Sequence, residues 1–227
     1  MKNIAVFIVL FIFESNIHAT DYTGNHFLVI AGYNHTVPFN IKTKDFSPEA
    51  ELETIPNGFL IGLSFANDKS VFHYEVSVSY LSSQFSHNGF DHSAAFSGHY
   101  NYDYRLEYFK FSVLPVAEFG KRLTIAGSFY PQLGVLCKAY YSGYYSYSVI
   151  DGRHSGPIFH SGNAKNDFLP FTLDLNTLLR LKYKFRDGNG VFIESRYSRS
   201  ISNINNRNEY RIGLKNFSLV TGISFNL

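Results

Sequence analysis

Hydrophobic and polar residues alternate along several stretches of the chain, most clearly from Phe171 to Phe185. The odd-numbered positions of this segment are apolar or aromatic apart from Thr177, and the even-numbered ones are polar or charged apart from Leu178. Successive side chains of a β-strand point to opposite faces, so a period of two predicts a strand with one apolar and one polar face. A helix would need apolar residues three and four positions apart instead.

Eight segments of this kind recur, at residues 25–33, 58–66, 71–81, 104–118, 122–137, 167–185, 191–199 and 209–227. Their connections alternate between short (67–70, 119–121, 186–190) and long (34–57, 82–103, 138–166), with a medium one at 200–208. Short turns at one end and long loops at the other, on an even number of strands, are typical of bacterial outer-membrane proteins. The pattern therefore predicts an all-β fold: an eight-stranded, antiparallel, up-and-down transmembrane β-barrel with long extracellular loops, short periplasmic turns and periplasmic termini.

The first 19 residues have the pattern of a secretory signal peptide, with Lys2, an apolar run from Ile4 to Phe13, and Ala19 at the expected cleavage position. The run of about ten residues is too short to cross roughly 30 Å of hydrocarbon as a helix. We therefore expect residues 20–227 to form a single exported domain. That domain would be integral to the bacterial outer membrane and in contact with its lipid and lipopolysaccharide.

Composition supports this interpretation and excludes others. The 227 residues include 17 Tyr and 23 Phe but no Trp, and rings near strand ends fit the aromatic girdles of a membrane barrel. A formal net charge of +2 gives little support for a nucleic-acid partner. One cysteine, Cys137, excludes an internal disulfide and a cysteine-based zinc cluster. With no phosphate-binding glycine loop before a helix, we expect no cofactor.

Three segments carry a family resemblance. The stretch Tyr104–Tyr140, YRLEYFKFSVLPVAEFGKRLTIAGSFYPQLGVLCKAY, resembles the paired central strands of the PorT-like outer-membrane β-barrel family of the Bacteroidetes. The stretch Gly190–Asn205, GVFIESRYSRSISNIN, is similar to that family's Glu-x-Arg-Tyr-Ser strand and Asn-Ile loop. The last strand, FSLVTGISFNL, resembles its terminal strand but ends in Leu227 rather than an aromatic residue. The resemblance implies an outer-membrane barrel without a shared catalytic set, and it allows a role in protein secretion.

The inward faces predict a charge network in the lumen. Pairing across the RDGNG turn, with Phe185 opposite Val191, would put Lys182 opposite Glu194. The expected members are Arg180, Lys182, Glu194, Arg196 and, from the last segment, Lys215. Buried charges must pair, so ion pairs that fill the barrel are the favoured interpretation, and a small anion or ligand site is the alternative. An eight-stranded barrel leaves room only for side chains, so a diffusion pore is not expected.

An enzymatic alternative comes from one inward face. His73, Glu75 and Ser77 occupy alternate positions, so their side chains would all point into the lumen, and neighbouring members of the set would lie about 6.6–6.8 Å apart along the strand. Such a set could serve a lipid hydrolase. However, His73 follows a short turn and should lie at the periplasmic end, away from the outer leaflet.

The predicted outer loops hold two further candidates. His87, His92 and His99, with Asp91 and Asp103, could bind a metal such as zinc, but their spacing matches no standard motif and solvated loop residues are favoured. The tyrosines of the sequence YYSGYYSY could instead form an adaptable surface for a protein or glycan partner; they are Tyr140, Tyr141, Tyr144, Tyr145 and Tyr147. Strand extensions above the membrane would explain the same tyrosines equally well.

The sequence therefore favours a non-enzymatic outer-membrane barrel that displays surface loops for binding or supports envelope organisation. A component of a bacterial secretion apparatus is the second hypothesis, and an outer-membrane lipid-modifying enzyme is the third.

Overall fold

The computed structural model describes residues 24–40, 51–55, 57–67, 70–92, 96–149, 156–206 and 211–227. Its elements are β1 (Asn25–Asn40), β2 (Glu51–Thr54), β3 (Gly58–Asn67), β4 (Phe72–His92), β5 (Phe96–Gly120), β6 (Leu123–Val149), β7 (Ile158–Asn163), the short 3-10 helix η1 (Lys165–Asp167), β8 (Phe171–Lys184), β9 (Gly190–Ser200) and β10 (Ile212–Asn226). The expected signal peptide, residues 1–19, lies outside the described residues. Within them, no helix is both long and apolar enough to span a membrane.

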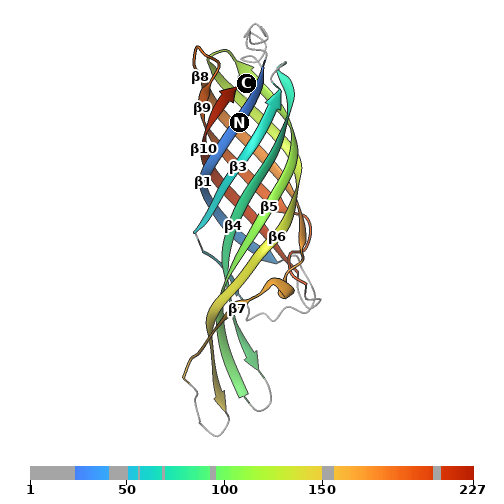
Figure 1. Cartoon of the computed structure of the whole chain (residues 1–227). Coiled ribbons are helices and arrows are strands. Elements are labelled where there is room, and N and C mark those ends of the chain that lie inside the picture. Colours follow the sequence, from blue (N-terminus) through green and yellow to red (C-terminus); the bar gives the residue numbers. More distant parts are fainter. Residues whose placement is uncertain are drawn as a thin grey trace, which may run out of the picture.

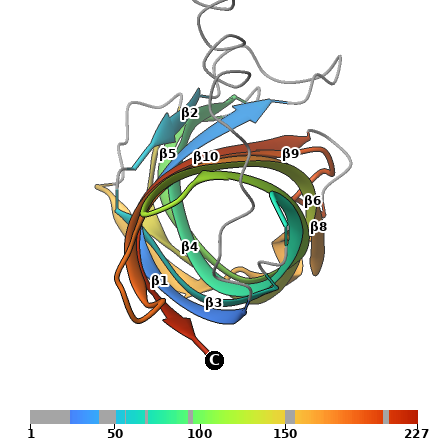
Figure 2. The same cartoon turned by 90° about the horizontal axis from the view of Figure 1, so that it is seen from above.

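Eight strands pair in a closed antiparallel ring, in the order β1, β3, β4, β5, β6, β8, β9 and β10, with β10 paired back to β1. Figure 2 shows the ring end-on. These strands correspond to the eight segments that alternate in the sequence, so the prediction of an all-β antiparallel fold is confirmed. The short connections β3–β4, β5–β6 and β8–β9 lie at the end of the ring where β1 begins and β10 ends (Figure 1).

Paired residues followed around the ring show how far the strands are staggered. The path that starts at Ala117 in β5 passes through β6, β8, β9, β10, β1, β3 and β4 and meets β5 again at Glu107, ten residues away. A stagger of this kind accompanies strands that are tilted, typically by about 35–45°, to the axis of the ring.

The outward face of every ring strand is apolar. One aliphatic residue from each strand, between 39% and 60% exposed, illustrates this: Val29, Leu63, Val76, Val113, Ile125, Leu179, Ile193 and Ile223. Soluble monomers rarely expose contiguous apolar patches larger than a few hundred Å². A belt that runs around a whole ring therefore indicates an apolar surrounding medium.

Aromatic residues border this belt on both sides. The row toward the short turns contains Phe27, Phe72, Phe119, Tyr183 and Phe225, and the opposite row contains Tyr33, Phe59, Tyr80, Phe109, Tyr197 and Phe217. On β10, eight residues separate Phe217 from Phe225, which is about 20 Å along the axis for a strand tilted by about 40°. This spacing is close to the ~25 Å apolar band of outer-membrane proteins.

Two connections that the sequence predicted as loops are largely strand. Residues 82–92 pair with 97–107, and residues 138–149 pair with 96–107, so β4, β5 and β6 continue far beyond the ring. β2 adds to the outer part of β4, and β7 adds to β6. We call this projecting five-stranded sheet the extension; it is the long finger at the bottom of Figure 1. The prediction of loops was wrong here because these segments are rich in polar and aromatic residues and poor in aliphatic ones, although aromatic residues favour strands.

Candidate functional site

Arg180 stands at the centre of an ion-pair network inside the ring. Its Nε donates a hydrogen bond to Glu194 Oε2 at 2.7 Å, and its two terminal nitrogens donate to the Glu75 carboxylate at 2.5 and 3.1 Å. Arg196 Nε donates to the other oxygen of Glu194. All four side chains are at least 94% buried, and burying charges is tolerated only with this degree of pairing.

The expected register around the β8–β9 turn was wrong by two residues. Tyr183, not Phe185, lies opposite Val191, so Arg180 rather than Lys182 faces Glu194. Phe185 belongs to the turn, where its N–H donates to the Asn189 carbonyl at 2.7 Å. Gly188 supports this tight turn with a φ of 86°, a backbone conformation that glycine adopts without strain.

Lys182 therefore has a different acidic partner from the one predicted. Its Nζ lies 4.0 Å from Glu118 Oε1, and the Nζ of Lys184 lies 2.9 Å from the same oxygen. Farther along the lumen, Lys110 Nζ lies 2.5 Å from Asp174 Oδ2 and 3.0 Å from Thr172 Oγ1. These partners were not among the residues predicted for the lumen network, although each occupies an inward position of an alternating segment and the same period of two would have identified it.

Lys215 is not part of the lumen network. It occupies an outward position of β10, directly opposite Arg199 of β9, and its Nζ lies 5.3 Å from the centroid of the Phe39 ring. The prediction that it lines the lumen was wrong because the buried positions of β10 on either side of it, at 214 and 216, are even-numbered.

Apolar side chains fill the lumen at the end away from the short turns. The buried cluster consists of Phe85, Leu106, Tyr108, Leu136, Ala139, Ala164, Phe168, Ile204, Ile212 and Leu214. The segment around η1 is tied into it, because the Ala164 N–H donates to the Ala139 carbonyl at 2.9 Å and the Leu169 N–H to the Ile204 carbonyl at 2.7 Å. Ion pairs and this apolar cluster together occupy the lumen.

The proposed hydrolase residues share an inward face but do not form a catalytic arrangement. His73 Nε2 lies 3.9 Å from Glu75 Oε1, and both Glu75 oxygens are already bound by Arg180. Ser77 Oγ is buried and makes no hydrogen bond to any described residue. Without a hydrogen bond from Ser77 to His73, His73 is not placed to activate this serine.

The histidines proposed for metal binding do not converge. His87 pairs with Tyr102 and His99 with Phe90, which places the two histidines on opposite faces of the extension. His92 pairs with Ser97 at the tip. The described residues contain no group of three His, Cys, Asp or Glu side chains that could hold a metal ion.

The proposed tyrosine surface is divided between the two faces of β6. Tyr140 and Tyr144 lie on one face of the extension, and Tyr141, Tyr145 and Tyr147 lie on the other. The second group shares its face with Tyr100 and Tyr102 of β5. We call the face defined by Tyr100, Tyr102, Tyr104, Tyr141, Tyr145 and Tyr147 the tyrosine face.

The side chains of the tyrosine face lie over glycines of neighbouring strands. A Cβ added at Gly89 would meet Tyr100, one at Gly98 would meet Tyr145, one at Gly143 would meet Tyr102, and one at Gly162 would meet Tyr141. The rings therefore lie over the glycines of the neighbouring strands, an arrangement that stabilises strand glycines. Burial raises the pKa of the Tyr102 hydroxyl, and the nearby Tyr141 and Tyr145 raise it further.

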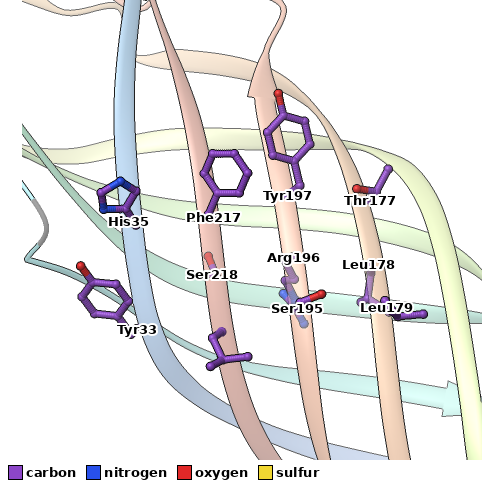
Figure 3. A pocket seen from close by; sticks show the side chains of 11 residues that line it. Tyr33, His35, Thr177, Leu178, Leu179, Ser195, Arg196, Tyr197, Phe217 and Ser218 are labelled. Atoms are coloured by element: carbon purple, nitrogen blue, oxygen red, sulfur yellow. The ribbon is translucent and has the colours of Figure 1, made fainter. Parts of the chain in front are cut away.

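A shallow groove of about 410 Å³ crosses the outward surface of β1, β10, β9 and β8 (Figure 3). Tyr33, Leu179, Tyr197, Phe217 and Leu219 form its apolar lining. The groove lies at the aromatic row on the side of the ring away from the short turns.

No family model matches the chain, and no curated protein matches it. Several solved outer-membrane proteins are similar in structure. Ail of Yersinia pestis, in complex with the heparin analogue sucrose octasulfate, is 15% identical with a TM-score of 0.40, over 90% of this chain and all of that one. Neisserial surface protein A is 12% identical with a TM-score of 0.45, over 90% and 98%. The outer membrane protease OmpT of Escherichia coli is 8% identical with a TM-score of 0.39, over 90% and 97%. Similarities this distant carry no argument about function.

Proposed function

We propose that this protein is an integral outer-membrane β-barrel that displays the extension on the cell surface as a binding element and has no catalytic activity. The observation that carries the proposal is that the closed ring has apolar residues on its outside and charged residues on its inside, the reverse of a soluble protein. All eight strands expose aliphatic residues outward, while charged residues such as Arg180 and Glu194 are buried inside. A closed ring leaves no strand edge unpaired, which is the condition for crossing a membrane with strands.

The orientation follows from the two ends of the ring. In bacterial outer-membrane barrels the short turns lie in the periplasm and the long connections lie outside. Here β1 begins and β10 ends beside the short turns, and the extension projects from the opposite end (Figure 1). The proposal therefore places the extension outside the cell.

The tyrosine face is the contact surface that we propose for a protein or glycan partner. Tyrosine offers a large, rigid contact area with a hydroxyl that can donate and accept hydrogen bonds. The rings lie over glycines rather than over long side chains, so they form a broad platform. A secretion role, which the PorT resemblance allows, would instead use contacts in the periplasm.

Insertion and orientation can be tested by labelling intact cells with a membrane-impermeant maleimide. In a Cys137→Ser background, Ser146→Cys in the extension should be labelled, and Asp187→Cys in the β8–β9 turn should be labelled only after the cells are lysed. The folded protein should also migrate differently on gels before and after heating. Solubility in carbonate without detergent would contradict membrane insertion.

Binding can be tested with purified protein against a panel of polysaccharides and surface proteins. The triple variant Tyr102→Ser, Tyr141→Ser, Tyr145→Ser should lose a ligand that the intact protein binds. The control Asn101→Ala, Ser142→Ala alters the opposite face of the same strands and should keep that ligand. Equal binding by both variants would contradict the proposed surface.

If cells without the protein lose secretion of other proteins and a barrel without the extension restores it, the secretion role replaces display.

A further inference from the structure

Two cations face each other on the outward surface of the ring. Arg199 of β9 lies directly opposite Lys215 of β10, and each is two residues beyond a member of the outer aromatic row, Tyr197 and Phe217 respectively. The Arg199 guanidinium carbon lies 5.2 Å from the centroid of the Phe39 ring, and Lys215 Nζ lies 5.3 Å from it. Both positively charged groups therefore lie close to the same aromatic ring, that of Phe39.

Among the described residues, neither cation forms an ion pair with a carboxylate. Arg105, another outward cation on this side of the ring, lies 2.9 Å from Glu107 Oε1. Like charges directly opposite each other on neighbouring strands destabilise a sheet. An anion bound by both Arg199 and Lys215 would reverse that effect, so the pair has the charge of an anion site.

The groove shown in Figure 3 begins at Tyr197 and Phe217, each two residues along its strand from one of the two cations. Phe217 and Tyr197, next to the two cations on their strands, are also part of its lining, and Leu179 and Leu219 extend it. A groove of about 410 Å³ with a largely apolar lining fits an alkyl chain that lies across these strands. Free phosphate would leave it empty.

We propose that Arg199, Lys215 and the groove bind a phosphorylated glycolipid of the outer leaflet, with its phosphate between the two cations and an acyl chain in the groove. Arginine can bind two phosphate oxygens at once, and lysine contributes a compact point charge. The inference rests on the proposed membrane insertion, because only then do the cations stand at the height of the lipid headgroups, just beyond the aromatic row.

The test measures the binding of lipid A bisphosphate to the detergent-solubilised full chain. The variant Arg199→Gln, Lys215→Gln should bind at least tenfold more weakly than the unaltered protein. The matched control Lys121→Gln, Arg122→Gln removes the same two charges from the β5–β6 turn at the other end of the ring and should bind normally. Dephosphorylated lipid A should bind to the unaltered protein at least tenfold more weakly than the bisphosphate.

Equal affinity of the Arg199→Gln, Lys215→Gln variant and the unaltered protein would overturn the proposal, and so would equal affinity for the two lipids. Inorganic phosphate that binds as tightly as the lipid would show a free-anion site and would also overturn it. Heat-dependent gel migration of each variant reports separately on barrel folding. A variant that folds but does not bind therefore bears on the lipid site alone, whereas failure of the unaltered protein to insert would remove the proposed function itself.

Discussion

At the scale of single residues, the lumen depends on buried carboxylates, two of which, Glu194 and Glu118, each pair with two cations. Glu194 accepts hydrogen bonds from Arg180 on one oxygen and from Arg196 on the other. Glu75 binds Arg180 from the opposite side. Loss of one carboxylate therefore leaves buried positive charge without compensation, which costs more than the pair itself contributes.

Glu194→Ala should destabilise the protein by about 3–5 kcal/mol, because Arg180 and Arg196 lose the carboxylate that joins them. Glu194→Gln should have a smaller effect, because an acceptor oxygen remains. Chemical unfolding in detergent measures both. Ser195→Ala, on the outward face of the same strand, is the control and should change the unfolding free energy by less than about 0.5 kcal/mol. An unchanged unfolding curve for Glu194→Ala would contradict the network.

At the scale of elements, close packing of glycine against the neighbouring strand shapes the extension. A Cβ at Gly143 would lie 2.0 Å from the Asn101 carbonyl oxygen and 2.8 Å from the Tyr102 Cα. Both atoms belong to the backbone, so they cannot rotate away as a flexible side chain would. The β5–β6 pairing in the extension therefore requires glycine at this position.

Gly143→Ala should destabilise the extension by about 1–3 kcal/mol, the usual cost of overpacking, while the ring remains folded. Limited proteolysis of intact cells should cut the extension of this variant faster than that of the unaltered protein. Gly127→Ala is the control on the same strand, since its nearest contact would be the Leu178 carbonyl oxygen at 3.9 Å. Equal proteolysis of the Gly143→Ala variant and the unaltered protein would show that the backbones are farther apart than described.

The sequence predicted the elements of the ring better than it predicted their exact pairing. An apolar outward face opposite a polar inward face demands strict alternation, so each ring strand was recognisable from aliphatic residues such as Leu179 and Leu181. The register of β8 against β9 depends on whether Phe185 ends a strand or begins a turn. Both registers keep the same alternation of polar and apolar residues, so the alternation could not distinguish them. The extension has few aliphatic residues, so the alternation in the sequence did not identify its strands.

At the scale of the whole molecule, ion pairs and three clusters of buried apolar side chains lie along the described lumen. Eight strands enclose a space just wide enough for side chains. Arg180, Lys110 and Phe168 occupy successive levels of that space.

The protein should therefore show no stepwise ion conductance in planar bilayers. Gel migration before and after heating should establish, for the same preparation, that the inserted protein is folded. Regular conductance steps from folded protein would mean that the apolar cluster around Phe168 opens in the membrane.

The enclosure of the lumen charges also separates them from dissolved ions. Mobile salt screens charges through water over about 8 Å at physiological ionic strength, and buried pairs are screened much less. Arg180 and Glu194 are each 1% exposed, so added sodium chloride should barely move the melting temperature. Arg199 is exposed, and its attraction to a phosphate should weaken as salt rises. Added salt should therefore weaken the proposed phosphate binding at Arg199 and leave the stability of the ring nearly unchanged.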